Sequence, residues 1–370
     1  LKVDCLALGM LTAIRKSLAF IGLRKGYDFG MQDIPAEDPV TYAMISRADT
    51  VGVFQIESRA QMSMLPRLKP QCFYDLVVEV ALVRPGPIVG GMVHPYLRRR
   101  QGLEPVSYPN EALKEALGRT LGVPVFQEQV MQIAMIAAGF TPGEADGLRR
   151  AMAAWKRKGG LERYYAKIVN GMTDRGYEKA FAEQIFEQIK GFSEYGFPES
   201  HAASFALLVY ASCWIKCHHP AEFLAAMLNS QPLGFYSPSQ LVQDAKRHGV
   251  EVRPADVLHS NLDCTLENLP HQPAVRLGLR MLSGLRWESA QRIVDARHEC
   301  PFDNAEDLAR RAALELHEMK LLASADALRS LSGHRRNAVW DASALRATPR
   351  LLRDAPVDED LLELSPAPEG

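Results

Sequence analysis

Apolar residues recur every three or four positions over much of the chain, which is the spacing of an amphipathic helix. The pattern covers residues 8–24 and returns over 53–68, 72–83 and nearly all of 111–228. Between the first two stretches, residues 28–51 are looser and contain two prolines. Breaks within the long stretch fall at Gly and Pro, as expected for short turns between helices. The sequence therefore predicts a mainly α fold.

The C-terminal part follows a different pattern. Residues 241–249 predict a short helix, and 250–262 predict a short strand because β-branched residues alternate there with polar ones. From 277 onward, small helices are joined by Ser-Gly turns, and two of these turns form a weak internal repeat over 277–345. Residues 346–370 are rich in Pro, Asp and Glu, which predicts a disordered or truncated linker.

Composition narrows the class of protein without naming a partner. The chain has 370 residues, of which 47% are apolar and 24% charged, as in globular proteins of two or three domains. The formal net charge is only -1, so nucleic-acid binding would have to depend on local basic patches. The net charge of the chain therefore neither supports nor excludes nucleic-acid binding.

The cysteines and the start of the sequence indicate the cellular compartment of the protein. Six cysteines are scattered along the sequence, and no signal-peptide pattern opens it, which favours a reduced, cytoplasmic location. The longest apolar run, 202–215, is shorter than the ~20 residues of a typical membrane span, so no membrane anchor is expected. The first residue is Leu1, in a strand-like run, which predicts a cut fragment.

Lys2 and Asp4 lie two positions apart in that opening run, so a strand would place both side chains on one face. A carboxylate beside an ammonium suits a Mg²⁺ site next to a phosphate. A salt bridge at the end of a strand explains the same pair, because Mg²⁺ usually has more than one carboxylate ligand. The residues alone leave both interpretations open.

Arg84 directly precedes Pro85-Gly86-Pro87 at the predicted end of a helix. Proline and the turn hold the backbone there, and a guanidinium can grip phosphate oxygens with two parallel hydrogen bonds. The alternative is an arginine that binds the last carbonyls of its own helix. Both remain possible at this point.

A basic stripe follows in the long helical stretch. Arg149 and Lys156 are seven residues apart, as are Arg150 and Arg157, so a helix aligns all four on one side. Such a stripe can bind phosphates, although a run of charge is more often a solvated face.

Two catalytic alternatives are weak. Ser200 and His201 are adjacent, but nothing places an acid to orient the histidine, so Ser-His hydrolysis is not favoured. Cys213 and Cys217 would share a helix face and are followed by two histidines, yet both lie in an apolar helix. No zinc is expected.

The two Ser-Gly turns resemble helix-hairpin-helix modules, in which backbone N-H groups hold a DNA phosphate without reading bases. The candidates are Gly284 with Arg286 and Gly333 with Arg335. Each turn has one glycine where the family motif often has two, so one hairpin could be purely structural.

An ordered set of motifs then resembles the bacterial C-family replicative DNA polymerase α subunit. Its members are 1–4, 53–58, 82–87, 126–129, 148–152 and 196–204. Within that family, 196–204 and 229–238 resemble the error-prone, damage-inducible branch.

The resemblance implies specific roles. Asp4 matches the third catalytic carboxylate of the palm, a ligand of two Mg²⁺ ions, and Lys2 matches the lysine near the nucleotide phosphates. Arg84, Arg149, Arg150 and His201 fall in fingers motifs close to the triphosphate or template. Lys156 and Arg157 join the hairpin residues Gly284, Arg286, Gly333 and Arg335 as DNA-binding candidates.

The same resemblance implies five parts. They are the end of the palm (1–10), the fingers (11–230), a connector with a short strand (231–276), the helix-hairpin-helix domain (277–345) and a linker (346–370).

The expected function is DNA-directed DNA polymerisation in lesion bypass and induced mutagenesis. Primer-template DNA and deoxynucleoside triphosphates are the substrates, and a sliding clamp and mutagenesis accessory proteins are the expected partners. No Asp-x-Asp pair precedes Asp4, so the fragment alone is expected to be inactive. The alternatives are a replicative α subunit of the same family and a non-catalytic DNA-binding scaffold.

Overall fold

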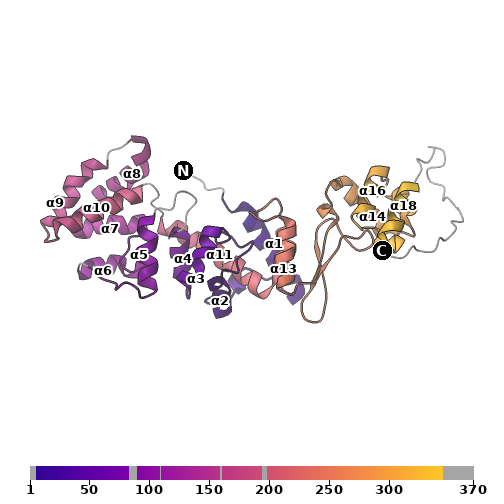
Figure 1. Cartoon of the computed structure of the whole chain (residues 1–370), viewed down its shortest axis with the longest axis horizontal. Helices are drawn as coiled ribbons and strands as arrows, with labels where there is room; N and C mark the ends of the chain where they lie inside the picture. The colour runs from indigo at the N-terminus through magenta and orange to yellow at the C-terminus, as the bar shows by residue number, and fades with distance from the viewer. Residues whose placement is uncertain (1–5, 83–89, 109, 159–160, 194–197, 345–370) are drawn as a thin grey trace. The chain divides into compact units, whose positions relative to one another are not determined.

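A computed structural model describes most of the chain (Figure 1). The described residues are 6–82, 90–108, 110–158, 161–193 and 198–344. They divide into two compact units. Unit 1 comprises residues 1–223 and 230–244, and unit 2 comprises 224–229 and 245–370.

Unit 1 is built from helices. Its N-terminal half contains α1 (Leu8–Lys25), α2 (Pro39–Ser46), α3 (Arg59–Leu68), α4 (Phe73–Leu82) and α5 (Gly90–Arg100). Then follow α6 (Glu111–Leu117), the 3-10 turn η2 (Gly118–Thr120), α7 (Gln127–Ala138), α8 (Pro142–Lys158), α9 (Tyr165–Thr173), α10 (Lys179–Ser193) and α11 (Glu199–His218). Helices α12 (Pro220–Leu228) and α13 (Pro238–Arg247) cross the division between units.

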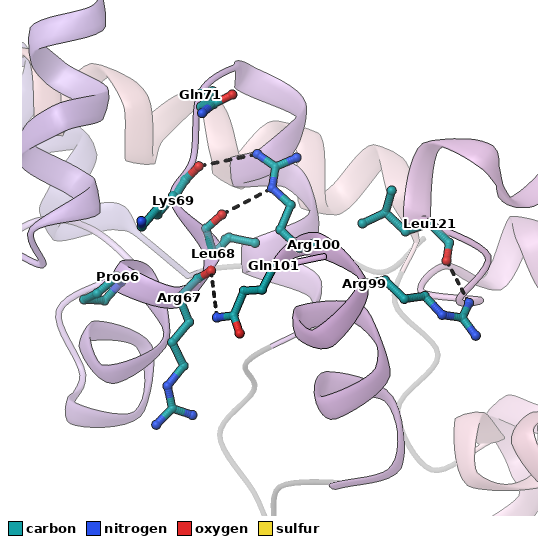
Figure 2. Close-up of a pocket in the computed structure, with 9 residues that line it drawn as sticks. All are labelled: Pro66, Arg67, Leu68, Lys69, Gln71, Arg99, Arg100, Gln101 and Leu121. Atoms are coloured by element: carbon teal, nitrogen blue, oxygen red, sulfur yellow. Dashed lines mark hydrogen bonds between the residues drawn. The ribbon is translucent and has the colours of Figure 1, made fainter. Parts of the chain in front are cut away.

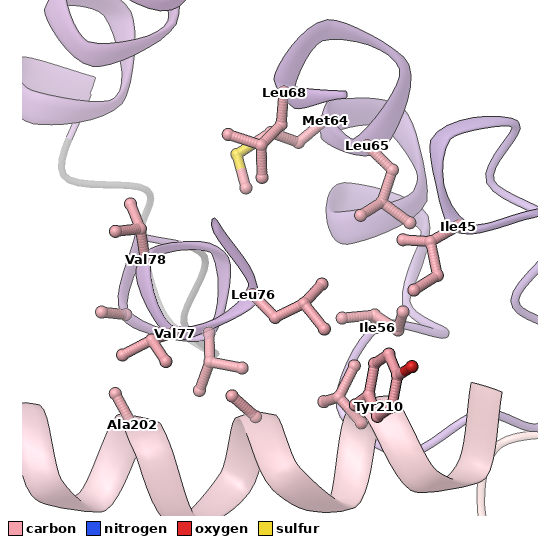
Figure 3. Close-up of a cluster of buried hydrophobic side chains, with 14 of the residues drawn as sticks. Ile45, Ile56, Met64, Leu65, Leu68, Leu76, Val77, Val78, Ala202 and Tyr210 are labelled. Atoms are coloured by element: carbon pink, nitrogen blue, oxygen red, sulfur yellow. The ribbon is translucent and has the colours of Figure 1, made fainter. Parts of the chain in front are cut away.

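The first core of unit 1 lies between α4 and α11, which pack against each other. Figure 3 shows Leu76 and Val77 of α4 facing Ala202 and Tyr210 of α11. Leucine and methionine side chains from α3 close the cluster from the opposite side (Figure 3). This core supports α11, which starts within the 196–204 motif.

The second core of unit 1 is formed by α6 to α10. Its large members include Ile133, Leu148, Met152 and Phe186, all buried. Helices α7 and α9 approach so closely that a Cβ at Gly171 would lie 2.3 Å from the carbonyl oxygen of Ala138. The second core therefore depends on a residue without a side chain at that crossing.

Unit 2 combines a small sheet with short helices. Strands β1 (Val252–Arg253), β3 (Ala274–Arg276) and β2 (Thr265–Glu267) lie in the order β1-β3-β2, the first pair parallel and the second antiparallel. The helices are α14 (Trp287–Glu299), α15 (Ala305–Arg311), α16 (Leu316–Ser324), α17 (Arg329–Ser332) and α18 (Arg335–Ala344), and they share one core. None of the described helices is both long and apolar enough to cross a membrane.

The mainly α prediction is confirmed, with local corrections. The helix predicted over 53–68 begins only at Arg59, because Gln55 has a φ of 64° and Ser58 caps the helix by accepting from the Gln61 N-H at 3.4 Å. The looser stretch 28–51 contains α2, which has an Asp38 cap. The predicted strand over 250–262 is only two residues long.

Candidate nucleic-acid interface

Two segments of the motif set, 126–129 and 196–204, meet at the start of α11 together with α4. The backbone N-H of Glu199 donates to Glu128 Oε2 of α7 at 3.0 Å, and the Tyr74 hydroxyl of α4 donates to Glu199 Oε1 at 2.8 Å. Burial, reinforced by the bond to Glu199, raises the pKa of Tyr74. Glu128 also places a negative charge at the positive end of the α11 dipole. The start of α11 is therefore held by both α4 and α7.

Gln129, next to Glu128, holds the loop that leads into α7. Its Oε1 accepts from the N-H groups of Val125 and Phe126 at 2.7 and 3.1 Å. Its Nε2 donates to the Ala116 carbonyl at 3.2 Å and to the Thr120 hydroxyl at 2.8 Å. This buried amide thus satisfies four polar groups, which explains on structural grounds why glutamine stands there.

His201 is the third residue of α11 and packs against the first core. Its ring is centred 4.3 Å from that of Phe205, and Phe205 meets Phe54 edge-on at 5.3 Å. The imidazole is partly exposed, so packing fixes its plane while part of the ring faces solvent.

Arg149 and Arg150 are held by one carboxylate on α8. Asp146 Oδ1 accepts from Arg149 Nη2 at 2.8 Å, and Asp146 Oδ2 lies 2.9 Å from Arg150 Nη2. The bond from Arg149, together with both positive charges, lowers the pKa of Asp146. Both guanidinium groups remain substantially exposed. The pair is oriented on its own helix and can still accept an anionic ligand.

The two hairpin turns of unit 2 share a backbone feature. Gly284 and Gly333 have φ values of 89° and 68°, in the region that favours glycine. A helix follows each turn, with Arg286 as the N-cap of α14 and Arg335 as the first residue of α18. Both arginines are exposed. Each turn therefore presents a cation at the positive end of a helix, a combination that suits a phosphate.

Comparison with known proteins places these features in a family. Residues 10–176 match the bacterial DNA polymerase III alpha subunit finger domain, and residues 249–338 match a helix-hairpin-helix motif. The error-prone DNA polymerase of Methylococcus capsulatus is 62% identical over 366 residues, covering 94% of the chain. Those of Bordetella bronchiseptica and Pseudomonas aeruginosa are 61% and 59% identical over 370 residues, covering 100% of the chain.

The chain matches the finger domain of the bacterial DNA polymerase III α subunit and is similar along its whole length to proteins named error-prone DNA polymerase. It spans 35% of the length of the first two relatives and 36% of the third. The helix-hairpin-helix match begins at residue 249, so it also takes in the small sheet that precedes the hairpins.

The predicted polymerase residues are not all described. Asp4, Lys2 and Arg84 lie outside the described residues, and so do the side chains of Lys156 and Arg157 on α8. Of the remaining candidates, Arg149 and Arg150 belong to helices around the second core, whereas His201 packs on the first.

The catalytic alternatives gain no support from the geometry. Cys213 is fully buried in the first core, where burial raises the pKa of its thiol, and His218 Nε2 pairs with Asp38 Oδ2 at 2.8 Å. These side chains form no cluster of converging metal ligands among the described residues. Ser200 and His201 are consecutive on α11 and project about 100° apart.

Sequence reasoning missed several polar groups that shape this region. Tyr74, Glu128 and Glu199 were not singled out, although Glu128 and Glu199 stand inside quoted motifs. Glu57 and Glu79 are buried in and around the first core, and burial raises their pKa values to about 7 and about 8. The signal for Glu79 was a lone carboxylate in the run 76–81, which is otherwise apolar.

Proposed function

We propose that the chain forms the finger and helix-hairpin-helix regions of an error-prone, DNA-directed DNA polymerase that extends a primer 3′ end with deoxynucleotides. The observation that carries the proposal is an identity of about 60% along the whole chain with proteins of that name. Its cellular role would be lesion bypass and damage-induced mutagenesis in the cytoplasm, together with a sliding clamp and mutagenesis accessory proteins.

In this proposal the triphosphate is bound by cations of the finger region. Arg149 and Arg150 are suited to this role because Asp146 orients both guanidinium groups while leaving them exposed. Arg84 and His201 would complete the binding site. Asp4 would be one ligand of two Mg²⁺ ions. In phosphoryl transfer such ions would stabilise the negative charge on the reacting phosphate. We expect the 370 residues alone to bind DNA without extending a primer.

The primer-template duplex would be bound through its phosphates. Exposed Arg286 and Arg335, each beside a glycine with positive φ, support this role for the two hairpins. Lys156 and Arg157 on α8 would add contacts to the backbone of the DNA. Contacts of this kind position a duplex without reading its sequence, as a polymerase requires.

The test is primer-template binding by the full-length protein, followed by fluorescence anisotropy, with and without the next correct nucleotide. We expect the correct nucleotide to tighten binding and a mismatched one to have little effect. The variant Arg149→Ala/Arg150→Ala should lose this tightening. The variant Lys114→Ala/Lys179→Ala removes the same charge from exposed sites on neighbouring helices and should keep it.

Two outcomes would count against the proposal. Equal binding to any duplex, regardless of nucleotide, would favour a non-catalytic DNA-binding scaffold. Primer extension that is unchanged by Arg84→Glu would contradict the role given to Arg84.

A further inference from the structure

A basic pocket of about 760 Å³ lies in unit 1, away from the residues discussed so far. It is formed by the ends of α3 and α5 and by Leu121, which follows η2 (Figure 2). Its polar lining consists of Arg67, Lys69, Gln71, Arg99, Arg100 and Gln101. Among the described residues that line it, four are cationic and none is acidic or aromatic. This composition favours an anionic ligand.

One wall of the pocket is held by Arg100 and Gln101. Arg100 Nη2 donates to Asp75 Oδ2 at 2.7 Å, and Arg100 Nε donates to the Leu68 carbonyl at 3.3 Å. Gln101 Nε2 donates to the Arg67 carbonyl at 3.2 Å. Figure 2 shows both side chains reaching toward the end of α3. Because Asp75 offsets its charge, Arg100 mainly positions this wall of the pocket.

Arg99 fixes the opposite wall. Its Nη1 donates to the Leu121 carbonyl at 2.8 Å, and its Nε donates to Glu104 Oε1 at 3.1 Å. The charge of Arg99 is therefore also offset by a carboxylate.

Arg67 and Lys69 differ from these two residues. Both are exposed, and neither has a carboxylate within salt-bridge distance in the part of the chain that the structure describes. Lys69 ends α3 with a φ of 47°, a conformation that only a few per cent of residues other than glycine adopt. The pocket thus contains two cations whose charge nothing in its described surroundings offsets.

The position of the pocket separates it from the expected triphosphate site. Segment 83–89, with Arg84, precedes α5, whereas Arg99 and Arg100 end it. A helix of that length places its two ends about 16 Å apart. The described candidates for the triphosphate site, Arg149, Arg150 and His201, also do not line the pocket.

We propose that this pocket binds a backbone phosphate of the DNA, with Arg67 and Lys69 as the contacts and Arg99, Arg100 and Gln101 as positioning residues. The absence of an aromatic side chain from its described lining argues against base stacking, and the surplus positive charge suits a phosphodiester. The proposal rests on the proposed function, because it takes DNA as the polyanion that the protein binds.

The test measures how DNA affinity of the full-length protein depends on salt, using primer-template DNA with a long single-stranded overhang. The variant is Arg67→Glu/Lys69→Glu. The control, Arg15→Glu/Arg59→Glu, makes the same charge change at two exposed arginines outside the pocket. We expect affinity at low salt to fall about tenfold in the pocket variant, and the slope of log affinity against log salt to become shallower by about 1, as expected for the loss of one phosphate contact.

Several outcomes would overturn the proposal. One is a pocket variant with the affinity and salt slope of the control. Another is unchanged DNA binding together with lost binding of tripolyphosphate, measured by calorimetry, which would make a free polyphosphate the ligand. The neutral variant Arg67→Gln/Lys69→Gln provides a second reading if charge reversal disturbs folding, and it should lower affinity by a smaller factor.

The same data separate this proposal from the proposed function. Tightening by the correct nucleotide should persist in the pocket variant. If the unmodified protein lacked that tightening but the pocket variant still flattened the salt slope, the polymerase proposal would fail and the phosphate site would stand.

Discussion

The two cores of unit 1 differ in the polar groups that they bury. In and around the first core, Glu57 and Glu79 are buried, and neither oxygen of Glu79 has a hydrogen-bond partner among the described residues. Between residues 110 and 193, the described buried polar side chains are Thr120 and Gln129, which are uncharged and bond to each other. One half of the unit thus carries buried titratable groups, whereas the described side chains of the other half include none.

Because of this difference, the two halves of unit 1 should respond differently to pH. A buried carboxyl without partners is stable only in its neutral form, so folding must retain a proton that the unfolded chain gives up. The first core supports α11, where Tyr74, Glu128 and Glu199 meet. We therefore expect pH to act on the start of α11 before it acts on the helices around the second core.

The largest predicted effect comes from Glu79→Gln. The pKa of Glu79 is raised to about 8 in the folded chain, from a usual value of 4.5. Between these two pH values the Glu79 carboxyl is protonated in the folded chain and ionised in the unfolded chain. The free energy of unfolding therefore falls as pH rises from 4.5 to 8, by at most about 5 kcal/mol. Glutamine stays neutral, so the variant should gain stability at pH 8 and little at pH 4.5. Urea unfolding at both pH values measures this.

Glu115→Gln, at an exposed position on α6, is the control and should be neutral at both pH values. If Glu79→Gln were no more stable than the unmodified protein at pH 8, the contrast between the two cores would be lost.

An intermediate effect should follow from Gly171→Ala in the second core. The added methyl would meet the Ala138 carbonyl at 2.3 Å, which forces α7 and α9 apart. Overpacking of this kind costs about 1–3 kcal/mol, and here the cost should not vary between pH 5 and 8. Gly118→Ala, where a methyl has no neighbour within 4 Å, should cost nothing. Denaturant midpoints of both variants would check this, and a pH-dependent loss in Gly171→Ala would contradict it.

The smallest predicted effect is a difference between two helix N-caps, one beside each core. Asn110 caps α6 by accepting from the Leu113 N-H at 2.9 Å, and its replacement by Ala should cost about 1 kcal/mol. Asp38 caps α2 by accepting from the Thr41 N-H at 2.8 Å, and it also pairs with His218. Asp38→Ala should therefore cost more, by about 1 kcal/mol.

The excess cost of Asp38→Ala should depend on pH. Burial tends to raise the pKa of Asp38, but the bonds from His218 and Thr41 outweigh it and lower the pKa below 3.8. The extra stability is thus present above pH 3.8 and disappears as pH falls through the lowered value. Thermal unfolding at pH 7 and pH 3 measures it, and equal costs for the two caps at pH 7 would refute the expectation.

Much of the fold could be predicted because helical periodicity is local. The helix predicted over 8–24 is confirmed as α1, and the one over 72–83 as α4. Helix α2 was missed because Pro35 and Pro39 suggested a loop, although proline is favoured at the first helical position, where Pro39 stands. Whether a proline starts a helix or interrupts one depends on the cap before it.

The site was only partly predictable. The turns at Gly284 and Gly333 could be found because positive φ favours glycine, which leaves a mark in the sequence. The pairing of Arg149 and Arg150 with Asp146 was also readable, at spacings of three and four, but was overlooked. The contact between Tyr74 and Glu199 joins residues 125 apart, and no local pattern encodes it.

The four hydrogen bonds of Gln129 restrict which residues can replace it. Asparagine would fall one methylene short of its partners, glutamate would lack the N-H donors, and leucine would remove a hydrogen-bond partner from four polar groups. Few replacements can therefore be tolerated at this buried position. A loss of function caused by a change at this position would therefore reflect the loss of a structural support and not of a catalytic group.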